Sequence, residues 1–293
     1  MMNILLASGA FSMVDVMVHH LSDAVLWEFK IGGFDLSITK RVMMMWVGCF
    51  FLLLIFLPVA RKIAKNPYKK PSRFVGMMEV FINFIRKDVG EGSMGHHSKH
   101  YEPFLLTLFF FVLISNLLGL VPPLGEVFLL AGEIFGLVHE TAGGGHEMPL
   151  AVKLWPGITA TGDIGVTGSL AIISFIVIQI AGFAHQGIAY IKNIVPKGIP
   201  APMWLIMWPI EFFGQFTKPF ALAIRLLANM TAGHMIILVF LGLIFQFAEY
   251  YMVAISVPAS AVIYLLELFV AFLQAYIFVF LTALFVAGAQ HRH

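Results

Sequence analysis

The chain has 293 residues, of which 60% are hydrophobic and only 12% are charged, whereas about a quarter of the residues in a soluble globular domain carry charge. This composition excludes an ordinary soluble domain and predicts one integral membrane domain over residues 1–293. The formal net charge of +2 is too small to favour nucleic acid as a partner, and the single cysteine, Cys49, excludes an intrachain disulfide.

The first apolar run, residues 42–60, is long enough to cross a membrane, because a crossing helix needs about 20 residues to span a hydrocarbon core of about 30 Å. A dense basic cluster follows it, made of Arg61, Lys62, Lys65, Lys69, Lys70 and Arg73. Such clusters are typical of the cytoplasmic side of a membrane. We therefore expect the N-terminal segment, residues 1–41, to lie outside. Its apolar start lacks the basic residues of a signal peptide, so we expect no cleavage.

Residues 61–102 are predicted to form a basic cytoplasmic segment. Within it, residues 74–86 mix apolar side chains with Glu79 and Arg86, and this stretch is too short and too polar to span a membrane. It predicts an amphipathic helix along the membrane surface. We expect the basic surface of residues 61–86 to contact anionic lipid head groups, a partner protein, or both.

Three histidines near the end of that segment, His96, His97 and His100, are dense enough to suggest a metal site. No cysteine or carboxylate accompanies them at a clear helical spacing. We therefore expect a solvated surface loop here and no metal.

Residues 103–191 predict a helical hairpin with an acidic outer loop. Its crossing segments are residues 104–121, which a Pro-Pro pair ends, and residues 165–191. The loop between them, residues 124–154, is poor in lysine and arginine and rich in glutamate, which suits the outer face. The sequence assigns no role to this loop.

Residues 192–218 predict an interfacial segment. The apolar stretch 201–216 contains two prolines and Glu211, so we expect a short interfacial or re-entrant helix instead of a crossing. Glu211 either anchors this helix at the interface or lines an inner channel, and the sequence leaves both readings open.

Residues 219–289 predict two long helices, 219–248 and 253–289. A straight helix of about 30 residues is about 45 Å long, which exceeds a perpendicular crossing, so both helices must tilt steeply or run partly in the membrane plane. The predicted fold class is an all-α integral membrane protein. It has about five membrane-crossing helices, the last two long and steeply tilted, plus amphipathic interfacial helices. Five crossings place the C-terminus in the cytoplasm.

Three ionisable residues interrupt the long apolar helices: Arg225, His234 and Glu267. Burying a charge in a membrane costs several kcal/mol, so such residues face a partner, water or a moving ion. One explanation is structural, with Arg225 pairing with Glu267 to tie two helices together. The alternative is a path for an ion.

The neighbouring residues favour an ion path. At helical spacing, Arg225 shares one broad face with small or polar residues, namely Ala221, Ala228, Asn229 and Ala232. Small residues let another helix approach closely. On the last helix, Glu267, Ala271 and Gln274 form a second stripe. Two facing helices decorated in this way would form a narrow polar seam.

Residues 220–234, with the sequence FALAIRLLANMTAGH, resemble the signature helix of subunit a of the F-type ATP synthase. Residues 266–278 resemble that family's final helix, and residues 103–122 resemble its second membrane helix. An Arg-x3-Asn-x4-His helix alone would be a weak signal. Joined to a Glu-x6-Gln helix and to this topology, it is specific, and the likeness covers about residues 101–289.

The resemblance implies a stator subunit of the Fo membrane sector that translocates protons through two half-channels against a rotating ring of c subunits. Arg225 matches the family's essential arginine, whose charge keeps the facing ring carboxylate ionised and prevents a proton short circuit. A guanidinium suits this task because it stays charged when poorly hydrated. The resemblance places six residues on the proton path: His234, Glu267, Gln274, Asn229, Asp163 and Asn116.

Two features depart from many bacterial members of that family. His234 and Glu267 stand where those members carry Glu and His, an exchange that mitochondrial members share. The exchange implies that the pair acts as a unit. Gly119 stands where some bacterial members carry Asp.

The implied partners are the c-ring subunits, the peripheral stalk subunit b and membrane lipid, without nucleic acid. We expect H⁺ in preference to Na⁺, although the ion-binding carboxyl belongs to the partner and both ions stay open. The expected location is a bacterial inner membrane, although the His/Glu arrangement also occurs in organelles. We expect no cofactor, no metal and no ATP chemistry on this chain, since the sequence contains no nucleotide-binding P-loop, nucleophile elbow or zinc signature.

Two other functions compete with this one. A self-contained, ion-coupled secondary transporter would often show internal repeats with matching broken helices, and the two halves of this sequence show no such symmetry. A structural membrane scaffold would leave the three ionisable residues in apolar helices unexplained.

Overall fold

The computed structural model describes residues 25–27, 30–31, 34–35, 37–65, 70–95, 98–121, 159–193, 195, 200–247 and 250–290. The acidic loop predicted over residues 124–154 and two of the three clustered histidines, His96 and His97, lie outside the described residues.

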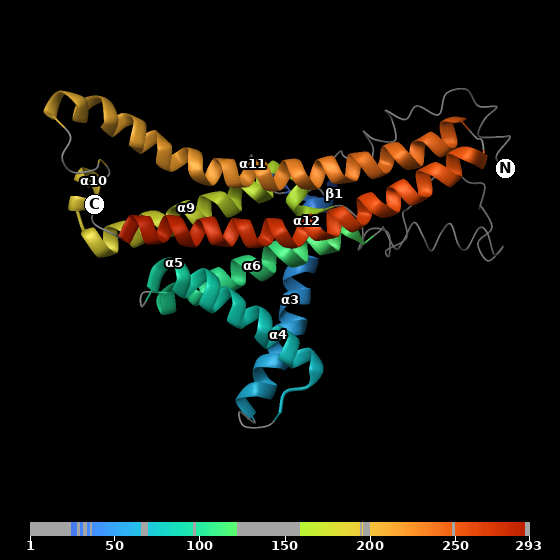
Figure 1. The fold of residues 1–293 in the computed structure, drawn as a ribbon, viewed down its shortest axis with the longest axis horizontal. Coiled ribbons are helices and arrows are strands. Elements are labelled where there is room, and N and C mark those ends of the chain that lie inside the picture. The colour runs from blue at the N-terminus through green and yellow to red at the C-terminus, as the bar shows by residue number, and fades with distance from the viewer. Residues whose placement is uncertain are drawn as a thin grey trace. The chain divides into compact units, whose positions relative to one another are not determined.

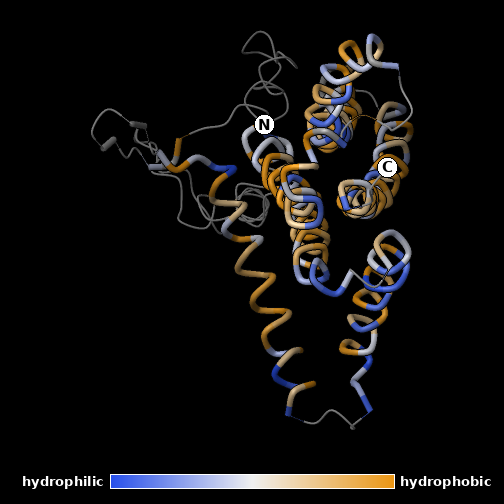
Figure 2. Tube along the Cα trace, turned by 90° about the vertical axis from the view of Figure 1, so that its left-hand side faces the viewer, coloured by the Kyte–Doolittle hydropathy of each residue, from blue (hydrophilic) through white to orange (hydrophobic). Residues whose placement is uncertain are grey.

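Five of the described helices are long and apolar enough to cross a membrane (Figure 1). They are α3 (Lys40–Lys65), α6 (Ser98–Leu120), α9 (Ile164–Gln186), α11 (Ala201–Phe247) and α12 (Tyr250–Gln290). Figure 2 shows this most clearly for α3, which is seen along its length and is hydrophobic in its middle and hydrophilic at its ends. The predicted all-α membrane protein with five crossing helices is therefore confirmed, and the last two helices are the longest.

The shorter elements connect and flank these helices. An N-terminal pair of antiparallel ladders precedes α3, with β1 (Val25–Trp27) paired to β4 (Ile38–Thr39) and β2 (Lys30–Ile31) paired to β3 (Phe34–Asp35). The predicted all-α fold contains no strands, and strands of two or three residues are too short to produce an alternating sequence pattern. Elsewhere the chain forms α4 (Arg73–Phe84), the π-helix η1 (Ile85–Glu91), α5 (Gly92–Met94), the 3-10 helix η3 (Ala160–Gly162) and α10 (Ala189–Lys192).

The structure differs from the expected break before residue 219. A separate short helix was predicted over residues 201–216, whereas α11 runs without interruption from Ala201 to Phe247 and contains Pro209 and Pro219. A proline removes one backbone hydrogen bond, but membrane helices tolerate this loss because local adjustments and neighbouring groups satisfy the freed carbonyl. The prolines therefore did not mark a helix end.

The described residues belong to two compact units, and α3, α6, α11 and α12 each contribute to both. The first unit takes its described residues from the ranges 1–50, 114–162 and 228–271. Its core includes Leu120 of α6, Met230 of α11 and Ala271 of α12. The second unit comprises residues 51–113, 163–227 and 272–293, and its most deeply buried side chains include Phe278 and Val279 of α12.

Candidate functional site

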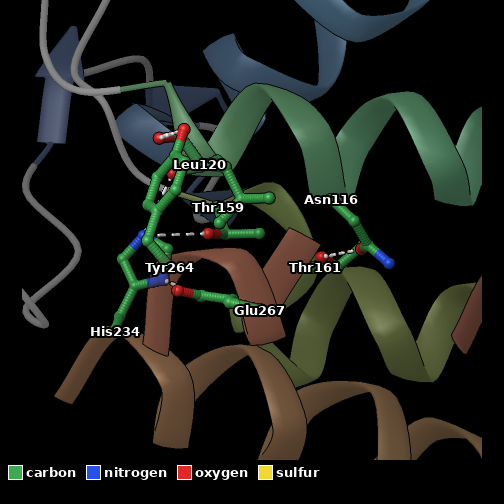
Figure 3. Close-up of polar contacts among 8 residues, drawn as sticks. Asn116, Leu120, Thr159, Thr161, His234, Tyr264 and Glu267 are labelled. Atoms are coloured by element: carbon green, nitrogen blue, oxygen red, sulfur yellow. Dashed lines mark hydrogen bonds and ion pairs between the residues drawn. The ribbon is translucent and has the colours of Figure 1, made fainter. Parts of the chain in front are cut away.

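An imidazole–carboxylate pair forms the centre of the first unit's polar site (Figure 3). Nδ1 of His234, on α11, lies 2.7 Å from Oε1 of Glu267, on α12. The Glu267 side chain is only 2% exposed, whereas that of His234 is 31% exposed. The second carboxylate oxygen, Oε2, is buried and has no hydrogen-bond partner among the described residues. Since a buried carboxyl group needs a partner, the imidazole is what compensates Glu267 here.

The other ring nitrogen of His234 fixes how protons are distributed in this pair. Nε2 lies 3.0 Å from the backbone carbonyl oxygen of Gly119 and 3.4 Å from the hydroxyl of Thr159. A carbonyl oxygen only accepts hydrogen bonds, so Nε2 carries a hydrogen and donates it. One further proton then lies between Nδ1 and Glu267, on either the nitrogen or the oxygen. Both arrangements have zero net charge, so the pair can pass a proton without creating an isolated buried charge.

Close packing holds this pair in place. A Cβ atom on Gly233 of α11 would lie 2.7 Å from Cδ of Glu267, so only glycine lets the two helices approach this closely. A Cβ atom on Gly119 would overlap the hydroxyl oxygen of Thr159. Thr159 therefore occupies the space that a side chain at position 119 would need, which explains how this chain accommodates glycine there.

This packing predicts the effect of adding a single methyl group. Gly119→Ala is expected to destabilise the protein by about 1–3 kcal/mol, since overpacking displaces neighbouring groups. Loss of folded protein on heating in detergent measures it. Gly168→Ala, where the new Cβ would meet no atom within 4 Å beyond the local backbone of its own helix, is the matched control and should have little effect. Adding Thr159→Gly to Gly119→Ala should restore most of the lost stability, and no recovery would contradict the overlap.

A second set of hydrogen bonds extends the polar site along α6. Thr161 donates its hydroxyl hydrogen to Oδ1 of Asn116 at 2.7 Å, and Nδ2 of Asn116 donates to the carbonyl oxygen of Ala271 at 3.3 Å. Asn116 and Thr161 are both fully buried. Tyr264, on α12, donates its hydroxyl hydrogen to the carbonyl oxygen of Leu120 at 3.2 Å.

The structure thus brings together three of the predicted site residues, Asn116, His234 and Glu267. It adds Thr159, Thr161 and Tyr264, which sequence reasoning missed. A signal for the two threonines existed, because they belong to the polar run Thr-Ala-Thr-Gly-Asp just before a crossing segment.

Two other predicted path residues belong to the second unit. Gln274 is buried on α12, two helical turns beyond Glu267. Asp163 stands at the N-cap of α9, where its backbone carbonyl accepts hydrogen bonds from the amide and the hydroxyl of Thr167 at 3.0 and 2.8 Å. The structure shows where these two residues lie in their unit and leaves their roles as predictions.

Arg225 lies on an exposed face of α11. Its side chain is exposed, and so are those of the small and polar residues predicted to share its face, Ala221, Ala228, Asn229 and Ala232. Leu222 and Leu226, on the opposite side of the same turns, are fully buried. The carboxylate of Glu267, which might have tied Arg225 to α12, is paired with His234 instead. An exposed guanidinium in an apolar helix calls for a partner outside the chain.

The second unit contains a polar cavity of about 320 Å³. Glu211, Gln215 and Lys218 of α11 line it, together with residues of α9, α10 and the end of α12. Nζ of Lys218 lies 5.3 Å from the ring centre of Phe285, a cation–π distance. Glu211 therefore faces a cavity, which favours the channel reading over the anchor reading. Among the described residues, no group of three or more His, Cys, Asp or Glu side chains could hold a metal ion.

Comparison with known proteins extends over nearly the whole chain. The family model described as ATP synthase A chain matches residues 42–287. A protein named ATP synthase subunit a from Chloroherpeton thalassium is 41% identical over 93% of this chain and 75% of its own length. One of the same name from Chlorobium phaeobacteroides is 41% identical over 95% and 76%. Another from Anaeromyxobacter dehalogenans is 35% identical over 95% and 71%.

Proposed function

This chain belongs to the ATP synthase A chain family, and from that premise we propose that it is the stator subunit that translocates protons beside a rotating ring of c subunits. Two half-channels load and unload the ring carboxyls. The observation that carries this proposal is the exposed Arg225 on a face of small side chains, in a helix otherwise fit to cross a membrane. Such a face suits close approach by another helix that bears the opposite charge.

Arg225 supplies the fixed charge in this mechanism. A carboxylate on the ring that reaches Arg225 stays ionised, because an opposite charge nearby favours the charged form. The guanidinium does not release its own proton, so it cannot act as a relay between the half-channels. Protons must therefore travel around with the rotating ring to pass from one half-channel to the other, and this requirement couples proton flow to rotation.

The outer half-channel runs along the polar site of the first unit. His234 and Glu267 exchange the proton held between them, and Asn116 lines the path through its buried amide. We place Gln274, Asn229 and Asp163 on the same route, as the family resemblance implies. The two allowed arrangements of the imidazole–carboxylate pair let it take a proton on one side and release one on the other.

The inner half-channel uses the polar cavity of the second unit. Glu211 supplies a carboxylate and Lys218 an ammonium group on the wall of a space large enough for several waters. Protons would move through that water between the ring and the cytoplasm. This assignment gives Glu211 a function as a channel residue.

The partners follow from the same proposal. The c-ring faces Arg225, and the basic surface of residues 61–86 meets lipid head groups and the peripheral stalk subunit b. The apolar helices and the bacterial relatives support a multi-pass protein of the bacterial plasma membrane, which we orient with its N-terminus outside and its C-terminus in the cytoplasm. H⁺ is the proposed ion, in preference to Na⁺.

An experiment with the purified chain tests this function against a self-contained transporter. Liposomes that contain the chain alone are expected to conduct no H⁺ under an imposed potential, because half of the path is missing. Liposomes that contain the chain with its c-ring are expected to conduct H⁺ passively. The measurement is the quench of a pH-sensitive dye. Flux through the chain alone, equal to that with the ring, would favour the transporter.

A further inference from the structure

A single buried tyrosine shapes the cavity of the second unit. Tyr190 lies on α10, which follows Gly187, a residue with φ of 58° that glycine adopts without strain. The flanking side chains of this turn are exposed, and Ile188 is 85% exposed, yet Tyr190 is buried. The burial of one aromatic residue in an exposed turn indicates that its ring packs into a specific site.

The Tyr190 ring packs directly against Gly182 of α9. A Cβ atom on Gly182 would lie 2.5 Å from the Tyr190 ring, closer than non-bonded carbon atoms come. The ring of Phe183 packs edge-on against Tyr190 with 5.1 Å between ring centres. Any side chain at position 182 would therefore displace the Tyr190 ring.

From this position against Gly182, the Tyr190 hydroxyl reaches the wall of the cavity. It donates a hydrogen bond to Oε1 of Gln215 at 3.2 Å, and Nε2 of Gln179 donates to the same oxygen at 2.8 Å. Burial raises the pKa of the Tyr190 phenol above its usual 10.0, and the hydrogen bond to Gln215 lowers it in part. The phenol therefore stays protonated at neutral pH and remains a donor. With two donors on one oxygen, the Gln215 amide is held in a single orientation.

Gln215 stands between the two charged residues of the cavity. Glu211 precedes it by four positions on α11 and Lys218 follows it by three, so the three side chains share one helix face. All three line the cavity, as does Tyr190 itself. Holding Gln215 therefore holds the stretch of wall between a carboxylate and an ammonium group.

We propose that Tyr190, seated on Gly182 and bonded to Gln215, is a positioning residue that keeps the inner proton path open. The inference rests on the function proposed above, because a positioning residue for protons requires that the chain translocate them. Tyr190 touches no reacting atom. It acts through Gln215 on the wall that Glu211 and Lys218 share.

A double-mutant cycle tests this in the complete complex. Passive H⁺ flux is measured in inverted membrane vesicles after the peripheral catalytic sector is stripped. Tyr190→Phe and Gln215→Leu are each expected to slow the flux about fivefold, the equivalent of one lost hydrogen bond. Because both remove the same bond, the double variant should be no slower than the slower single variant. Ile188→Ala, two residues away and exposed, is the matched control and should conduct normally.

A labelling measurement separates the shape of the cavity from conduction. In a Cys49→Ser background, Gly288→Cys places the only thiol on the cavity wall, where the structure leaves open space around the new side chain. A membrane-impermeant thiol reagent is added to the exposed cytoplasmic face. Gly182→Ala, which unseats the Tyr190 ring, is expected to slow both labelling and passive flux.

Two results would overturn the proposal that Tyr190 keeps the inner proton path open. Wild-type flux in Tyr190→Phe, or effects of Tyr190→Phe and Gln215→Leu that multiply, would mean that their hydrogen bond does not serve the path. Slower labelling in Gly182→Ala with unchanged flux would mean that Tyr190 shapes a cavity that carries no protons. Neither result would affect Arg225, whereas failure of the proposed function itself would appear as continued pumping by Arg225→Ala.

Discussion

Replacing Arg225 with alanine is expected to abolish ATP-driven H⁺ pumping while the ring and stalk still assemble. In the mechanism we propose, a ring carboxylate that reaches this position without the guanidinium loses the charge that keeps it ionised. An uncompensated charge in a membrane costs about 3 kcal/mol or more, which corresponds to on the order of a 100-fold loss in rate. The measurement is acidification of inverted vesicles that contain the complete complex, with assembly checked by recovery of the ring with the purified complex.

Two further variants sharpen this result. Ile224→Ala changes the neighbouring exposed side chain without changing charge, and it should leave pumping close to normal. Arg225→Lys keeps a positive charge but loses the planar guanidinium and can release its proton when poorly hydrated, so we expect little recovery. Coupled pumping by Arg225→Ala at the wild-type rate would return this residue to a structural role and would remove the main support for the rotary proposal.

His234→Ala and Glu267→Ala are each expected to slow pumping by tenfold or more, because a positioned acid or base contributes about 10²–10⁴-fold to proton transfer. Exchanging the two residues, as His234→Glu with Glu267→His, should restore part of the rate. The restoration should be incomplete, because the carbonyl oxygen of Gly119, now 3.0 Å from Nε2 of His234, offers no hydrogen to a carboxylate. The initial rate of vesicle acidification measures all three variants.

A control variant and one possible result decide how the exchange of His234 and Glu267 is interpreted. Leu266→Ala alters an exposed residue next to Glu267 on α12 and should pump normally. If the exchanged double variant were no faster than the slower single variant, the imidazole and the carboxyl would not act as one relay. The 2.7 Å contact between them would then be a packing contact of the two helices.

The family and the number of crossings were both predictable from the sequence. Apolar runs of about 20 residues report a lipid environment directly, because the length of a crossing helix is set by the thickness of the membrane. The resemblance of residues 220–234 to subunit a is confirmed by the family match and by relatives at about 40% identity. Helix ends were less predictable, since Pro209 and Pro219 lie inside α11 and not at its boundary.

The site was predictable only as a list of residue types. Arg225, His234 and Glu267 stood out because ionisable side chains are costly in apolar helices, and this cost does not depend on any particular packing. Their partners could not be read from the chain. His234 is bound by groups 33, 75 and 115 residues away, and one of them is a backbone carbonyl that no residue type reveals.

The sequence by itself therefore determined the lipid environment, the family and which ionisable residues are candidates for the functional site. Only the tertiary structure decided that Glu267 pairs with His234, that Arg225 faces outward, and that Glu211 lines a cavity with Gln215 and Tyr190. The physical reason is that hydropathy and charge belong to single residues and survive in any arrangement of the helices. A hydrogen bond depends on distances of about 3 Å between atoms far apart in the chain, and only packing sets those distances.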